Sequence, residues 1–184
     1  TKPIGTGALF AADMRAKARG PWIAAALRGM CTSNAPAAAV LRAHGARACT
    51  DVTGFGLLGH LLEMCRGAGG ARAAVDLARV PLYDGALECV QRGIMSSLQP
   101  ANSRLRRAVE NHNEVCGSDR YPLLFDPQTS GGLLAALPKA RAQACLEAMR
   151  AIAPHAEIVG EVLGHAPAAA DDGGPPPLIT VRGA

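Results

Sequence analysis

Short apolar segments of strand length alternate with amphipathic helical segments along this chain, and this alternation restricts the fold more than any other feature. Such an order is typical of an α/β or α+β fold. The sequence therefore predicts layered helices packed on a mixed sheet. Strands are expected at 46–52, 73–77, 123–125, 132–137, 156–163 and 178–182. Helices are expected at 21–44 (in two pieces, the second capped by Ser33 or Asn34 and ended by Gly45), 54–66, 84–92 (with an acidic cap) and 138–152.

Two stretches lack a regular pattern. Residues 95–121 are polar and rich in Asn and Arg, and they predict a loop with a helical piece around 104–110. Residues 166–177 are rich in Asp, Gly and Pro, which predicts a flexible surface loop. The length of 184 residues fits a single domain over 1–184.

Composition argues against several classes of protein. No run of 18 apolar residues occurs and the first residues do not have the order of a signal peptide, so we expect a cytoplasmic protein without a membrane partner. The formal net charge is +4, but the basic residues are scattered and only 3% of residues are aromatic, so no nucleic-acid partner is expected. The six cysteines form no CxxC pair, which excludes a zinc ribbon or a thioredoxin-like motif. In a chain of this size they favour buried free thiols over a disulfide framework.

The segment TDVTGFGLLGH (50–60) has the pattern of a site for magnesium and phosphate. Asp51 stands at the end of an expected strand, and glycines follow at the start of a helix. A carboxylate in this place can hold Mg²⁺, and the backbone amides of a helix start can face phosphate. The spacing alone favours a structural role, in which Asp51 caps the helix and the glycines permit close packing.

The segment DPQTSGG (126–132) is the second candidate. Its small polar residues and glycines fit a backbone nest for an anion, or a tight hairpin loop between two strands. His60 is interpreted as a packing group rather than a catalyst, because no nucleophile neighbours it in the sequence. Cys49 is expected on the same strand face as Asp51, without a neighbour that would activate its thiol.

Both segments resemble signatures of the selenide, water dikinase (selenophosphate synthetase) family, which lies within the aminoimidazole ribonucleotide synthetase superfamily. The resemblance rests on TDVTGFGLLGH (50–60), DPQTSGGLL (126–134) and TKPIGTG (1–7), and it covers essentially the whole chain. It corresponds to the C-terminal half of that family. The resemblance therefore implies a fold like the C-terminal domain of aminoimidazole ribonucleotide synthetase.

The resemblance also implies a reaction, in which the family converts ATP, selenide and water into selenophosphate, AMP and phosphate with Mg²⁺. Asp51 falls on the magnesium-binding aspartate that the family's C-terminal half contributes. The reactive cysteine or selenocysteine and the other metal-binding aspartates belong to the family's N-terminal half, which binds ATP and forms the homodimer. No catalytic residue is therefore assigned in this chain, and the chain alone is expected to be inactive.

Two alternatives accompany this interpretation. One is another enzyme of the same superfamily, acting on a purine precursor or on thiamine phosphate; the length of the match at 50–60 counts against it. The other is a non-catalytic domain that binds a nucleotide or a protein partner. Dependence of the reaction on selenide would separate selenophosphate synthesis from the first alternative. Co-purification with a partner in the absence of activity would indicate the second.

Overall fold

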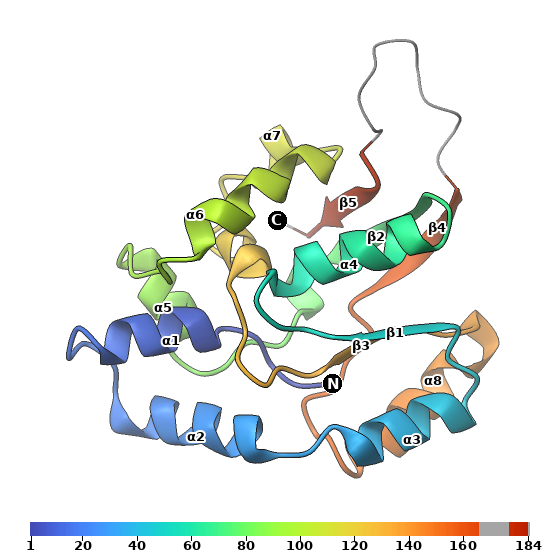
Figure 1. Ribbon diagram of the computed structural model, residues 1–184, viewed down its shortest axis with the longest axis horizontal. Helices are drawn as coiled ribbons and strands as arrows, with labels where there is room; N and C mark the ends of the chain where they lie inside the picture. The colour runs from blue at the N-terminus through green and yellow to red at the C-terminus, as the bar shows by residue number, and fades with distance from the viewer. Residues whose placement is uncertain (166–176, 184) are drawn as a thin grey trace.

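The computed structural model describes residues 1–165 and 177–183 (Figure 1). Its α-helices are α1 (Thr6–Asp13), α2 (Gly20–Cys31), α3 (Ala35–Ala43), α4 (Gly56–Gly67), α5 (Ala86–Gln91), α6 (Gln99–Asn102), α7 (His112–Val115) and α8 (Lys139–Arg150). Its 3-10 helices are η1 (Leu77–Arg79), η2 (Ser103–Ala108) and η3 (Tyr121–Phe125). Its strands are β1 (Ala48–Asp51), β2 (Ala71–Asp76), β3 (Leu133–Ala136), β4 (Gly160–His165) and β5 (Ile179–Arg182).

The strands form two separate sheets. β1 and β3 pair antiparallel, with Cys49 opposite Ala135 and Asp51 opposite Leu133. In the second sheet the order is β4-β2-β5, with β2 antiparallel to β4 and parallel to β5. The prediction of helices layered on mixed β-structure is therefore confirmed, although the strands do not join into one sheet within the described residues.

The β1–β3 pair lies between two layers of helix. Figure 1 shows α4 on one side of this pair, and α3 with α8 on the other. Leu134 packs into the main core on the α4 side, whereas Leu133 and Ala135 pack against the helices of the opposite side. This alternation follows from the two-residue period of a strand, and it leaves the residues on both faces of β3 half-buried.

Two hydrophobic cores result from this layering. The larger core includes Leu58 and Leu62 of α4, together with apolar residues of β2, β5 and η3. The smaller core consists chiefly of Leu41 from α3 and Leu146 and Met149 from α8. The helix expected at 138–152 is confirmed, since its apolar residues at helical spacing fill this second core.

Several predicted elements differ from the structure. The strand expected at 123–125 is wrong, because this buried stretch forms the 3-10 helix η3 with Pro122 in its first turn. The acidic cap expected for 84–92 is also wrong, since α5 follows Gly85 at φ +82° without a side-chain cap. Strand β4 begins at Gly160 rather than at 156. The helical piece around 104–110 corresponds to η2, and the loop expected at 166–177 lies almost entirely outside the described residues.

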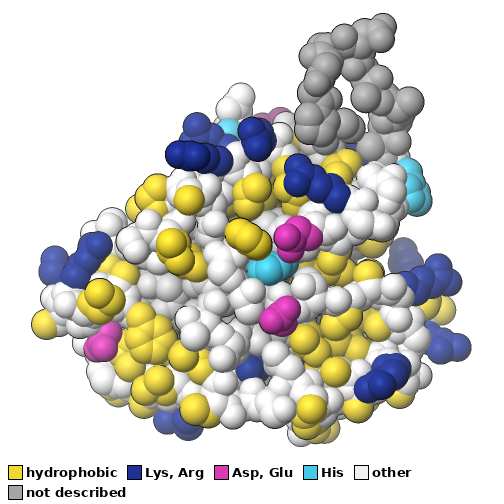
Figure 2. Space-filling view, in the orientation of Figure 1, with side chains coloured by type: hydrophobic (Ala, Val, Ile, Leu, Met, Phe, Trp, Pro, Cys, Tyr) yellow, Lys and Arg dark blue, Asp and Glu magenta, His cyan; other side chains and the backbone are white. Residues whose placement is uncertain are grey.

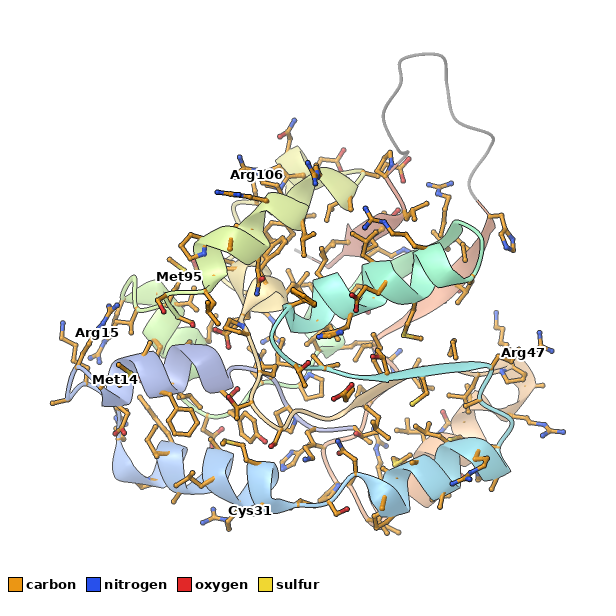
Figure 3. The ribbon with its side chains drawn as sticks, in the orientation of Figure 1. Met14, Arg15, Cys31, Arg47, Met95 and Arg106 are labelled. Atoms are coloured by element: carbon orange, nitrogen blue, oxygen red, sulfur yellow. The ribbon has the colours of Figure 1, made fainter. Side chains whose placement is uncertain are left out.

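The surface agrees with the scattered charge of the sequence. Figure 2 shows Lys and Arg side chains dispersed around the visible face, with apolar patches between them. Cys31, at the end of α2, and Arg106, on η2, point away from the body of the molecule (Figure 3). Among the described residues, no helix is long and apolar enough to cross a membrane.

The cysteines divide by burial, so the expectation of buried thiols holds for half of them. Cys65, Cys89 and Cys145 are buried, and Cys31, Cys49 and Cys116 are exposed. Burial raises the pKa of each of the three buried thiols, which keeps them protonated and unreactive.

Candidate functional site

Asp51 is the last residue of β1, and its side chain is exposed. Its backbone is held opposite Leu133 in the β1–β3 ladder. Within residues 1–165 and 177–183, its carboxylate has neither a hydrogen-bond partner nor an ion-pair partner. The structure thus holds the backbone of this residue rigidly and leaves its carboxylate oxygens open to a ligand.

The turn after Asp51 is fastened to the second candidate segment. The Val52 amide donates to the Gly132 carbonyl over 2.8 Å, and the Gln128 amide donates to the Thr53 carbonyl over 3.0 Å. The Asn102 side-chain amide donates to the Gly54 carbonyl over 2.8 Å and also to the Phe125 carbonyl. The structure therefore brings 50–60 and 126–132 side by side, although they are far apart in the sequence.

Gly56 opens α4 at the point where this turn meets η3. Its φ is +71°, and a Cβ at this position would lie 2.8 Å from the Phe125 carbonyl carbon. The interpretation that glycines here permit close packing is thus confirmed. The alternative that Asp51 caps α4 is wrong, because the cap residue is Phe55 and no side chain of the cap bonds to the helix start.

We expect Gly56→Ala to lower the free energy of unfolding by about 2 kcal/mol or more, because the left-handed backbone and the crowded Cβ both oppose a side chain. Gly67→Ala, at the other end of α4, is the matched control. A Cβ there meets nothing within 4 Å, so we expect it to be neutral or stabilising by at most about 1 kcal/mol. Urea denaturation of both variants measures the difference, and equal effects would contradict this account of the turn.

His60 lies in α4 with both ring nitrogens engaged. Nε2 is 3.1 Å from the Thr53 hydroxyl, and Nδ1 is 3.1 Å from a Glu63 carboxylate oxygen. The ring is buried, with only 7% of the residue exposed. This geometry agrees with its interpretation as a packing group, since it ties α4 to the turn that follows Asp51.

The segment 126–132 is neither a hairpin loop nor an open nest. It connects η3 to β3, and β3 pairs with β1, so the hairpin alternative is wrong. Two amides that a nest would use are occupied, because Gln128 donates to the Thr53 carbonyl and Thr129 donates to the Thr6 hydroxyl. The segment instead supplies an acidic side chain of its own, that of Asp126.

Asp126 is completely buried at the N-terminus of α1. One carboxylate oxygen, Oδ2, accepts from the Gly7 amide at 2.9 Å and from the Gln128 side-chain amide at 3.0 Å. The other oxygen, Oδ1, has no hydrogen-bond partner among the described residues. Burial raises the pKa of Asp126 to about 7, and the hydrogen bonds from Gln128 and Gly7 oppose that rise only partly.

Gln128 links this carboxylate to the start of α1. Its Oε1 accepts from the Gly5 and Thr6 amides and from the Thr6 hydroxyl, at 2.9 to 3.1 Å. Its amide group donates to the Asp126 backbone carbonyl at 2.7 Å. Sequence reasoning missed this role, since no local pattern pairs Gln128 with a helix more than 100 residues away. The only available signal was that α1 lacks a capping side chain of its own.

Cys49 lies on the same strand face as Asp51, as predicted, and both are exposed. Partial desolvation raises the pKa of the Cys49 thiol; the Thr1 amino group opposes this rise and the Asp51 carboxylate adds to it. The thiol is therefore not activated as a nucleophile. Within the part of the chain that the structure describes, no three His, Cys, Asp or Glu side chains gather into a metal site.

Comparisons with known proteins relate this arrangement to one group of enzymes. Residues 7–170 match the family model "AIR synthase related protein, C-terminal domain". A selenide, water dikinase of Bordetella bronchiseptica is 36% identical over 176 residues, which cover 93% of this chain and 48% of the relative. A selenide, water dikinase of Escherichia coli K12 is 41% identical over 143 residues, which cover 76% of this chain and 40% of the relative.

A solved structure of the hydrogenase maturation protein HypE shares the fold. It superposes with a TM-score of 0.62 at 17% identity, covering 89% of this chain and 42% of that protein. The chain spans about half the length of the curated relatives that it matches.

Proposed function

This chain belongs to the AIR synthase related protein family, matching its C-terminal domain, and on that basis we propose that it is the C-terminal domain of an ATP-dependent selenophosphate synthetase. The resemblance inferred from the motifs is confirmed by relatives named selenide, water dikinase. The proposed reaction converts ATP, selenide and water into selenophosphate, AMP and phosphate. In this proposal the chain is part of a longer protein that also contains an N-terminal half. The chain covers 48% of the length of the Bordetella relative, which supports this.

The observation that carries the proposal is the open carboxylate of Asp51. Its neighbours in 50–60 are engaged in holding the turn, through the backbone of Val52 and Thr53 and the ring of His60. A hard carboxylate oxygen at a rigid strand end suits Mg²⁺, which prefers oxygen ligands and keeps waters and phosphate oxygens as its other ligands. When bound, Mg²⁺ would neutralise phosphate charge during transfer.

A single carboxylate provides only part of a magnesium–nucleotide site. Such sites combine one or two carboxylates with substrate phosphates, and the described residues offer no acidic cluster around Asp51. We therefore place the remaining metal-binding aspartates and the reactive cysteine or selenocysteine in the N-terminal half. Residues 1–184 alone would fix the position of one ligand and would not turn over substrate.

Phosphorus NMR tests this function directly. The longest natural product of the gene, incubated anaerobically with Mg-ATP and selenide, is expected to give a selenophosphate resonance that requires selenide, together with AMP. Residues 1–184 alone are expected to leave ATP intact. A folded long protein that also leaves ATP intact would overturn the proposed function and favour a non-catalytic binding domain.

A further inference from the structure

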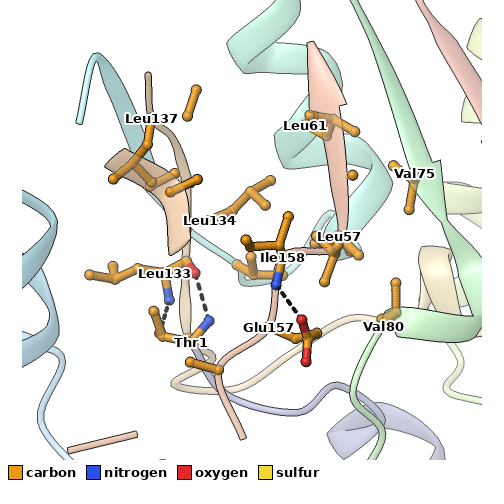
Figure 4. Close-up of a pocket in the computed structure, with 18 of the residues that line it drawn as sticks. Thr1, Leu57, Leu61, Val75, Val80, Leu133, Leu134, Leu137, Glu157 and Ile158 are labelled. Atoms are coloured by element: carbon orange, nitrogen blue, oxygen red, sulfur yellow. Dashed lines mark hydrogen bonds between the residues drawn. The ribbon is translucent and has the colours of Figure 1, made fainter. Parts of the chain in front are cut away.

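Two cavities of this structure differ in what they offer a ligand. The first has a volume of about 230 Å³, and Figure 4 shows apolar side chains such as Leu57 projecting into it. The polar side chains drawn there are engaged, since Thr1 is hydrogen-bonded to Leu133 and the Glu157 carboxylate accepts from the Ile158 amide at 2.9 Å. This cavity therefore offers a ligand little beyond apolar contact.

The second cavity has a volume of about 490 Å³, which is in the range of sites for small organic ligands. It lies between the C-terminal half of α2, the link from α2 to α3 (Figure 1), residues 82–84 and residues 152–155. Apolar side chains make up much of its lining, among them Ala25, Pro36, Leu82, Ile152, Ala153 and Pro154. An occupant of this cavity therefore needs an apolar body.

The hydroxyl of Tyr83, which lines this cavity, has no hydrogen-bond partner within residues 1–165 and 177–183. Only 9% of Tyr83 is exposed, and burial raises its pKa, so the hydroxyl keeps its proton and can donate it in a hydrogen bond. The hydroxyl oxygen lies against Gly29 of α2, where a Cβ would overlap it. Because glycine weakens a helix, α2 gives up stability at the position that admits this hydroxyl. A ligand in the cavity would supply the missing hydrogen bond.

The N-terminus of α3 adds a positive potential to the cavity. Its cap residue, Asn34, does not cap the helix, because the side-chain amide donates to the Gly131 carbonyl at 2.9 Å. The Ser33 hydroxyl accepts from the Ala35 amide at 3.2 Å, but no acidic residue stands in the first turn of α3. The positive end of the helix dipole therefore has no counter-charge on its own helix.

The charged side chains of the lining also favour an anion. The Lys2 ammonium group donates to the carbonyls of Thr32 and Ser130 at 2.7 and 3.0 Å, which fixes its charge beside the link between α2 and α3. Arg28 also lines the cavity and has no ion-pair partner within the described residues. These two cations stand against the carboxylate of Asp84 in the lining, which is therefore net positive.

We propose that this cavity binds a small organic oxyanion, namely a phosphate monoester or a carboxylate carried on an apolar body. The charged group accepts a hydrogen bond from the Tyr83 hydroxyl and lies in the positive potential of Lys2, Arg28 and the α3 N-terminus. The apolar body contacts the walls formed by α2 and residues 152–154. Asp51 does not line this cavity, so the proposal stands independently of the reaction proposed above.

The test is a titration of residues 1–184 with phenyl phosphate, followed by ¹H–¹⁵N NMR. We expect saturable shifts of the Asn34, Tyr83 and Ala153 amides, with a Kd of about 1 mM or below. Tyr83→Phe removes only the unpartnered hydroxyl, so the chain should stay folded and bind phenyl phosphate about 10-fold more weakly. Tyr121→Phe is the matched control. Tyr121 is also buried, but its hydroxyl pairs with His112 outside the cavity, so the affinity should not change.

Three further ligands separate the parts of the proposal. Benzoate, compared with phenyl phosphate, shows whether the site prefers a carboxylate or a phosphate. Inorganic phosphate lacks the apolar body and phenol lacks the charge, so each should bind at least about 10-fold more weakly than the preferred anion. Arg28→Gln removes a positive charge from the lining, and it should weaken the binding of both organic anions by about 2- to 5-fold.

The absence of saturable shifts at these amides with both phenyl phosphate and benzoate would overturn the proposal. So would binding that Tyr83→Phe leaves unchanged, or binding of phenol or inorganic phosphate as tight as that of the organic anions. If residues 1–184 do not fold alone, calorimetric titration of the longest natural product of the gene makes the same comparison among the ligands and the variants. The readout is affinity rather than selenophosphate formation, so failure of this proposal is distinguishable from failure of the proposed function.

Discussion

Replacing Asp51 with asparagine in the longest natural product of the gene is expected to lower the rate of selenophosphate formation by about 100-fold or more. A bound metal ion stabilises the charge of the transition state by several kcal/mol, and its ligands hold it in place. An amide oxygen is a weaker ligand for Mg²⁺ than a carboxylate. Because the Asp51 side chain is exposed and unpartnered within the described residues, the free energy of unfolding should change by no more than about 0.5 kcal/mol. The measurements are phosphorus NMR rates and urea denaturation.

Asp13→Asn is the matched control, since Asp13 is also an exposed aspartate at the end of an element. It should leave both the rate and the stability unchanged. Undiminished selenophosphate formation by the Asp51→Asn variant would refute the metal assignment. Loss of rate accompanied by an equal loss of stability would assign Asp51 a structural role instead.

The stability of residues 1–184 is expected to fall as the pH rises from about 4 to about 7, owing to Asp126. Its pKa is about 7 in the folded chain against an ordinary value of 3.8. Between these values the unfolded chain releases the proton while the folded chain retains it, so raising the pH favours unfolding. The effect levels off above pH 7 and below pH 4, and the full span is on the order of 4 kcal/mol.

Asp126→Asn isolates this contribution. The amide oxygen can still accept from the Gly7 N–H but carries no titrating proton, so the variant should lose the pH dependence. Denaturation of the unmodified chain and of the Asp126→Asn variant across pH 4 to 8 gives the difference in their free energies of unfolding at each pH. The contributions of the other titrating groups, including the Thr1 amino group, cancel in this difference. Parallel stability curves would show that Asp126 does not titrate in this range.

The sequence predicted elements whose pattern is local. α4 and α8 repeat apolar residues at helical spacing, and the strand at 46–52 precedes a glycine turn, so these appear close to their expected positions. The run 123–125 was assigned wrongly, because a short apolar run is equally compatible with a strand and with a buried helical turn. Pro122 favours the helical start that the structure shows.

Long-range pairing could not be predicted. The contact between Thr53 and Gln128, and the position of Asp126 under α1, depend on segments that are distant in the sequence. Glycines at 131 and 132 suggested room for an anion, whereas the structure uses them for the close approach of Val52 and Lys2. The role expected for Asp51, which the sequence supports through its place before the glycines and through the resemblance to a family, stays a prediction.

The buried cysteines are divided between the two hydrophobic cores, so the modification of each thiol reports partial unfolding of the core to which it belongs. Cys65 and Cys89 belong to the larger core, and Cys145 belongs to the smaller core that supports β1 and β3. A thiol reagent can reach these residues only when the surrounding core opens. Modification of Cys145 therefore reports loosening of the layer that carries Asp51, and modification of Cys65 or Cys89 reports loosening of the rest, without any engineered label.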